Sequence, residues 1–175
     1  STNLSATDAA TDIAKIANIT GMTSDEYRRF GSSVSALGNH FATTETDIVE
    51  MANRLASAGR LTGLTNQEIL GLATSMSSVG IEAEAGGTAM TQTLTAIEQA
   101  AVSGGEQLDK FASIAGMSSE QFATTWKNKP IEAIQAFIKG LGELDSKGES
   151  ATLVLDEMGL SGVRQSNMLK SLALA

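Results

Sequence analysis

The chain of 175 residues has no cysteine and only one histidine, one proline and one tryptophan. Without cysteine, neither a disulfide framework nor a thiolate metal or redox site can form. His40 alone cannot provide two-histidine zinc ligation, and any Ser/His/Asp triad would have to use it. It follows Asn39 at the end of a helical stripe, where capping carbonyls or facing solvent is the simpler interpretation. We therefore expect no metal site, no cofactor and no catalytic residue.

Positive charge is also scarce, because 12 Lys and Arg stand against 20 Asp and Glu, a formal net charge of −8. This balance opposes tight binding to nucleic acid, which depends on basic side chains that neutralise phosphates. The longest stretch without Asp, Glu, Lys or Arg, 30–44, is rich in Ser, Thr and Gly. It is shorter than the roughly 20 apolar residues of a membrane span. We expect no nucleic-acid readout and no membrane contact by this segment. The start lacks a basic region followed by an apolar one, so we expect a mature or excised piece.

Glycine is abundant, with 17 copies, whereas aromatic residues make up only 4% of the chain. Apolar residues recur at intervals of three and four along nearly the whole sequence, and nothing alternates with a period of two. The pattern predicts an all-α fold, a compact array of about nine or ten short helices joined by glycine corners, with no sheet. Pro130 suits the first turn of a helix over 131–144.

Glycine pairs mark the clearest joints between the predicted helices. The segment GIEAEAGG, which ends at 87, can be either a loop or a weak, bent helix. We place any domain boundary near 103–105, which gives an N-terminal helical part, 1–103, and a C-terminal helical part, 104–175. The two parts can also form one continuous domain.

A seven-residue pattern occurs three times, as GMTSDEY at 21–27, GLTNQEI at 63–69 and GMSSEQF at 116–122. The Ser or Thr can cap a helix N-terminus, and the Glu or Gln three residues later can reach back, which is a capping box. The glycine suits the left-handed position that ends the preceding helix. These corners consist of Gly21, Thr23 and Glu26, of Gly63, Thr65 and Glu68, and of Gly116, Ser118 and Gln121. We interpret the repeat as helix punctuation rather than as a ligand site.

Carboxylate pairs are the remaining candidates for chemistry, and glycosidase work could be proposed for Glu82 with Glu84 or Asp156 with Glu157. Neighbours this close along a helix do not face each other, so a solvated acidic face is favoured. Trp126, which shares an apolar stripe with Phe122, is interpreted as a core anchor rather than a stacking platform. We expect this segment not to be an enzyme.

Two longer stretches have a recognisable order. ALGNHFATTETDIVEMANRLASAG precedes GLTNQEILGLATSMSSVGIEAEAGGTAMTQTLTAIEQA, and LDKFASIAGMSSEQFATTWKNKPIEAIQAFIKGLGEL precedes GESATLVLDEMGLSGVRQSNMLKSLA. Over residues 34–174 the chain resembles the core region of phage tail tape measure proteins. The resemblance depends on an ordered series that includes Gly116, Phe122, Trp126, Pro130, Ala133, Phe137, Gly140, Leu141, Gly148, Leu155, Gly159 and Arg164.

This resemblance implies a structural role in a phage tail. Members of the family are very long, mostly helical proteins that lie inside the growing tail tube, set its length and leave through the tip when DNA is ejected. The implied partners are other copies of the tape measure protein, tail tube and tail-tip proteins, and tail assembly chaperones. The implied location is the tail interior of the virion, after assembly in the bacterial cytoplasm from a phage or prophage gene.

Arg164 is the family-matching charged position in GLSGVRQ. Its guanidinium can satisfy helix carbonyls or an acidic neighbour such as Asp156 or Glu157, which we favour. It can also contact another tape measure copy or a tail-tip protein. Two other classes stay open for the whole chain. One is a non-phage helical adhesin or signalling-type interaction domain, which the regular glycine corners oppose. The other is a fragment of a tail-associated cell-wall hydrolase, for which we find no transglycosylase motif and no zinc-binding histidines.

Overall fold

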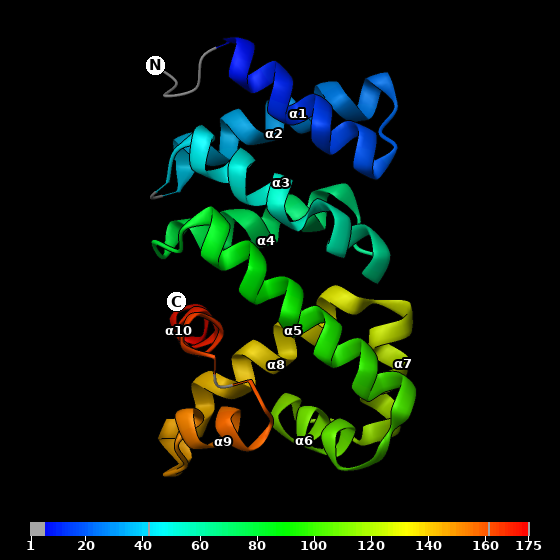
Figure 1. Cartoon of the computed structure of the whole chain (residues 1–175), viewed down its shortest axis with the longest axis vertical. Coiled ribbons are helices and arrows are strands. Elements are labelled where there is room, and N and C mark those ends of the chain that lie inside the picture. The colour runs from blue at the N-terminus through cyan, green and yellow to red at the C-terminus, as the bar shows by residue number, and fades with distance from the viewer. Residues whose placement is uncertain (1–5, 42, 161, 175) are drawn as a thin grey trace. The chain divides into compact units, whose positions relative to one another are not determined.

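The computed structural model describes residues 6–41, 43–160 and 162–174 (Figure 1). Within these ranges the chain forms ten α-helices and one 3-10 helix, and it contains no strand. The predicted all-α fold is therefore confirmed. In the same ranges, no helix combines the length and the apolar character needed to cross a membrane.

The chain divides into two compact units, Ser1–Thr88 and Ala89–Ala175. The division falls inside a helix, α5 (Ala83–Ser103), whose first residues belong to one unit and the rest to the other. Residues 103–105, where we expected a domain boundary, form the junction of α5 and α6, and a boundary at that junction stays a prediction. The segment GIEAEAGG is helical from Ala83 onward rather than a loop.

The first unit is built around one central helix. Its elements are α1 (Ala6–Thr20), α2 (Ser24–His40), α3 (Glu45–Thr62), α4 (Asn66–Ser78) and the start of α5. Helix α3 lies between α1 and α4 and also contacts α2 (Figure 1). Ile48, Met51 and Leu55 on α3 are almost completely buried, together with Phe30 from α2 and Met76 from α4. Val49, Ala52 and Ala56 beside them on α3 are also fully buried, so this helix is covered over more than the single apolar stripe of a surface helix, as expected of a central one.

In the second unit, α8 has the corresponding position. After α5 come α6 (Gly105–Ala115), α7 (Ser119–Asn128), α8 (Pro130–Leu144), the 3-10 helix η1 (Asp145–Lys147), α9 (Ala151–Glu157) and α10 (Val163–Ala173). Helix α8 contacts α6, α7, α9 and α10. Pro130 is its first residue, as predicted, where a proline removes no intrahelical hydrogen bond.

An aromatic cluster fills the centre of the second unit. Phe111 from α6 stacks on Phe122 from α7, with ring centroids 6.1 Å apart and an interplanar angle of 10°. Phe111 also meets Phe137 from α8 edge to face, with centroids 5.1 Å apart. All three side chains are fully buried. Such pairs contribute about 0.5–1.5 kcal/mol beyond the area they bury, so the cluster holds α6, α7 and α8 together.

Helices in both units end in the same way. At six corners a glycine with a positive φ, between 68° and 95°, is followed by a residue whose N–H donates to the carbonyl five residues earlier. This is the Schellman arrangement, which satisfies carbonyls left open at a helix end. The donor and acceptor pairs are Met22 and Ala17, Leu64 and Gly59, Ile81 and Met76, Met117 and Ala112, Glu149 and Leu144, and Leu160 and Leu155. This local hydrogen-bond pattern therefore occurs at most of the positions where the described chain passes from one helix to the next.

One glycine is required for a different reason, which is close helix packing. Gly140 is buried in α8, and a Cβ added to it would lie 1.8 Å from the carbonyl oxygen of Ile114 in α6. That distance is far below any van der Waals contact, and the obstacle is backbone rather than a flexible side chain. Any larger residue at this position would force α6 and α8 apart.

We expect Gly140→Ala to destabilise the protein by about 3 kcal/mol, the upper part of the usual range for overpacked cores. The matched control is Gly71→Ala in α4, where an added Cβ meets nothing within 4 Å. This control should gain about 0.5–1 kcal/mol from the helix propensity of alanine. Urea unfolding followed by circular dichroism measures both changes. Equal stability of Gly140→Ala and the wild type would show that α6 and α8 do not approach as described.

Candidate functional site

The first repeated corner, which connects α1 to α2, contains a complete capping box. The hydroxyl oxygen of Thr23 accepts a hydrogen bond from the N–H of Glu26 at 3.2 Å. In return, the carboxylate of Glu26 accepts a bond from the N–H of Thr23 at 2.7 Å. Two N–H groups that a helix start leaves open are thereby satisfied, and the Glu26 charge lies near the positive end of the helix dipole. Gly21, two residues before Thr23, has a φ of 68°.

The second and third corners differ in one hydrogen bond. Thr65 accepts from the N–H of Glu68 at 3.1 Å, and Glu68 accepts from the N–H of Thr65 at 2.9 Å. At the third corner Ser118 accepts from the N–H of Gln121 at 3.1 Å. In the described part of the chain no bond returns from the Gln121 side chain to Ser118. The third corner therefore has the cap but only half of the box.

Arg60 connects the two repeated corners of the first unit, those of Gly21 and Gly63. It lies in the last turn of α3, three residues before Gly63, and its Nη1 donates to the carbonyl oxygen of Thr20, the last residue of α1. A Cβ at Gly21 would lie 3.8 Å from this guanidinium. A cation at the C-terminal end of a helix is favourable, because the open carbonyls carry partial negative charge. The end of α1 is therefore fixed by a side chain from 40 positions further along the chain.

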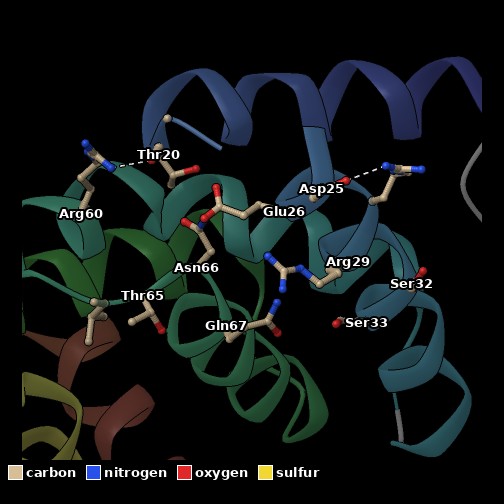
Figure 2. A pocket seen from close by; sticks show the side chains of 13 residues that line it. Thr20, Asp25, Glu26, Arg29, Ser32, Ser33, Arg60, Thr65, Asn66 and Gln67 are labelled. Atoms are coloured by element: carbon tan, nitrogen blue, oxygen red, sulfur yellow. Dashed lines mark hydrogen bonds and ion pairs between the residues drawn. The ribbon is translucent and has the colours of Figure 1, made fainter. Parts of the chain in front are cut away.

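Between these two corners lies an open cleft of about 1240 Å³ (Figure 2). All the residues that line it belong to the first unit. Leu64 is the one large apolar residue in the lining, and it is itself buried. The others are small, polar or charged: Thr20, Gly21, Asp25, Glu26, Arg28, Arg29, Ser32, Ser33, Arg60, Thr65, Asn66 and Gln67. The cleft thus offers charged and hydrogen-bonding groups together with a comparable amount of apolar surface.

Most charged side chains of the cleft have a hydrogen-bond or ion-pair partner, but one arginine has no carboxylate partner in the described structure. Asp25 and Arg28 form an exposed ion pair at 2.6 Å, and the Glu26 carboxylate accepts the capping bond from the N–H of Thr23. Arg60 donates to the carbonyl of Thr20. Arg29 is exposed, and within the described residues no carboxylate pairs with it. One guanidinium is therefore available in a cleft whose other charges are largely engaged.

The two aromatic residues singled out in the sequence lie in the second unit. Phe122 is fully buried in the aromatic cluster, and Trp126 is 3% exposed. The indole Nε1 of Trp126 donates to the carboxylate of Glu98 at 2.6 Å, which connects α7 to α5. A buried tryptophan commonly needs such a partner for its N–H. Arg164 belongs to α10, but its side chain lies outside the described part of the structure, so both interpretations of it stay predictions.

The residues considered for chemistry are dispersed on the surface. His40 is exposed in the last turn of α2, and Glu82, Glu84, Asp156 and Glu157 are exposed as well. In the described ranges no group of three or more His, Asp or Glu side chains is arranged to hold a metal ion. Sequence reasoning did not identify Arg29 or Arg60. The position of Arg60 before Gly63 indicates a carbonyl contact, but not that the carbonyl belongs to another helix.

The family model described as "Phage-related minor tail protein" matches residues 1–172, nearly the whole chain. The chain therefore belongs to the family of phage-related minor tail proteins, and it is a tail component of the virion. No curated protein and no solved structure was found to match it.

The unequal corners lead to a testable difference. Glu68→Ala should lower the free energy of unfolding by about 1 kcal/mol, because the Thr65 N–H loses its acceptor and the helix dipole loses a compensating charge. Gln121→Ala, the matched change at the third corner, removes no capping bond and should change the free energy of unfolding by no more than a few tenths of a kcal/mol. Chemical denaturation of the two variants measures the difference. Equal losses would mean that the two corners are capped alike in solution.

Proposed function

We propose that this chain is a segment of a phage tail tape measure protein, with a structural role in tail assembly and length determination and a further role in genome ejection. The observation that carries the proposal is the family match over residues 1–172. The helical fold is consistent with it, because every element in the described ranges is helical. The resemblance of an ordered series of residues to tape measure proteins supports the more specific assignment.

The partners proposed for this role are the components of a tail under construction. They are other copies of the tape measure protein, tail tube and tail-tip proteins, and tail assembly chaperones. The segment would lie in the tail interior after assembly in the host cytoplasm. Its role is structural and includes no catalysis.

The glycine corners impose a physical requirement on a length-setting role. A continuous helix of 169 residues, from 4 to 172, would span about 250 Å at 1.5 Å per residue. A compact unit of about 88 residues has a radius of gyration of only about 12 Å. Folding free energies are about 5–15 kcal/mol, so binding along a tube could supply enough energy to open the corners. We propose that the two units are folded before assembly and extend inside the tail.

An in-frame deletion of residues 4–172 in the parent phage tests the length role, with tail length measured by electron microscopy. We expect shorter tails, with a loss between a few tens of Å and about 250 Å, according to how far the segment extends. A deletion of similar length in a different region of the same gene is the control for a general assembly defect. Tails of normal length would contradict the length role, and normal-length tails that fail to deliver DNA would assign the segment to the tip or to ejection.

A zymogram on peptidoglycan tests the non-enzymatic assignment. The chain should give no cleared band, because its histidine is single and exposed and the carboxylates considered for glycosidase chemistry are exposed neighbours. A known lysozyme in the adjacent lane shows that the gel reports hydrolysis. A cleared band from the purified chain would identify it as a cell-wall hydrolase and contradict the proposal.

A further inference from the structure

The cleft of the first unit contains a cation whose natural partners are used elsewhere. Arg29 lies in α2, four residues after Asp25 and three after Glu26, the spacings at which helical ion pairs form. Asp25 instead pairs with Arg28 at 2.6 Å, and Glu26 accepts the N–H of Thr23 at 2.7 Å. In the described structure the Arg29 guanidinium therefore has no carboxylate partner, although two lie within one helical turn.

The surroundings of Arg29 suit a ligand that accepts several hydrogen bonds. Arg29 from α2 and Gln67 from α4 extend into the cleft from opposite sides (Figure 2). Ser32, Ser33 and Asn66 add hydroxyl and amide groups to the same lining. Arg60 uses Nη1 for the Thr20 carbonyl, which leaves further N–H donors of its guanidinium. Donors from α2 and α4 thus face one open space, and the Arg60 guanidinium lies at another part of the same lining, beside Thr20 (Figure 2).

The size and polarity of this space favour a polypeptide over a small molecule. Its volume of about 1240 Å³ exceeds the roughly 300–1,000 Å³ of typical ligand pockets, which are mostly apolar. Here polar and apolar surface contribute about equally to the lining, and its one large apolar side chain, Leu64, is buried. Nucleic acid is disfavoured, because its phosphate backbone needs several free cations, whereas Arg28 and Arg60 are engaged and leave Arg29 as the one unpaired cation of the described cleft. A planar guanidinium pairs best with a carboxylate, through two parallel hydrogen bonds.

We propose that this cleft binds an acidic segment of a partner polypeptide, with a Glu or Asp side chain of that segment paired to Arg29 and flanked by Gln67 and Ser33. The binding site is defined by its own geometry and does not depend on the tape measure role. A tail protein of a different kind could use it in the same way. The tail-length experiment and the binding experiment can therefore fail separately.

The test uses the whole chain of 175 residues and two short fluorescein-labelled peptides. One peptide alternates Glu with Ser, and the other has Gln in place of every Glu. Fluorescence anisotropy at low ionic strength should show binding of the Glu peptide and not of the Gln peptide, and binding should weaken as salt is added. Arg29→Gln should weaken binding of the Glu peptide by about tenfold or more, because a charge-assisted pair is lost.

Arg54→Gln is the matched control, since it removes the same charge from an exposed arginine of α3 that does not line the cleft. Its affinity should stay within about twofold of the wild type, as expected for a distant, screened charge. Both variants should unfold at the wild-type denaturant concentration, since Arg29 has no partner to lose among the described residues.

Four results would overturn the proposal. The first is no binding of the Glu peptide by the wild-type chain at millimolar concentration, and the second is an equal loss in Arg29→Gln and Arg54→Gln. The third is displacement of the peptide by millimolar inorganic phosphate, which would make the cleft a small-anion site. The fourth is tighter, Arg29-dependent binding of single-stranded DNA than of the peptide.

Discussion

The left-handed glycine corner is the constraint on which the rest of this structure depends. The chain has a single proline, which starts a helix, and most changes of direction in the described ranges occur at glycines with positive φ. In six of them the following N–H donates to the carbonyl five residues earlier, which fixes the angle at which the chain leaves the helix. That angle brings the apolar faces of successive helices together. The cores of both units and the cleft between two corners all follow from it.

Local rules account for what could be predicted from the sequence. Helix positions follow from the spacing of apolar residues, and Pro130 begins α8 because the first helical position tolerates a missing N–H. Thr23 and Thr65 cap helices through bonds to residues three positions away, which a sequence pattern can represent. Contacts between distant elements are different. The approach of Gly140 to the Ile114 carbonyl has no local signature in the sequence. The bond from Arg60 to Thr20 has none either, so the cleft that it borders could not be predicted.

The two units achieve a similar packing with different side chains. In the first, the buried residues of α3 and α4 are aliphatic side chains and methionines, and Phe30 of α2 is the one buried phenylalanine among its described residues. In the second, three phenylalanines form the centre, and buried or half-buried side-chain hydrogen bonds connect helices that are distant in the sequence. Gln165 donates to Thr93 at 2.9 Å, and Gln107 donates to the Met158 carbonyl at 2.7 Å. Such bonds are directional, so they specify which helices meet as well as contributing energy.

The distribution of aromatic residues has a practical consequence for anyone who studies this protein in solution. Its one tryptophan, Trp126, lies in the core of the second unit, and its one tyrosine, Tyr27, lies half-buried in the first. Selective excitation of the indole therefore reports only the unit with the phenylalanine cluster, whereas the phenol reports the unit with the cleft. The natural chain already contains one optical probe for each half, and the order in which the two halves lose structure can be followed without introducing a label.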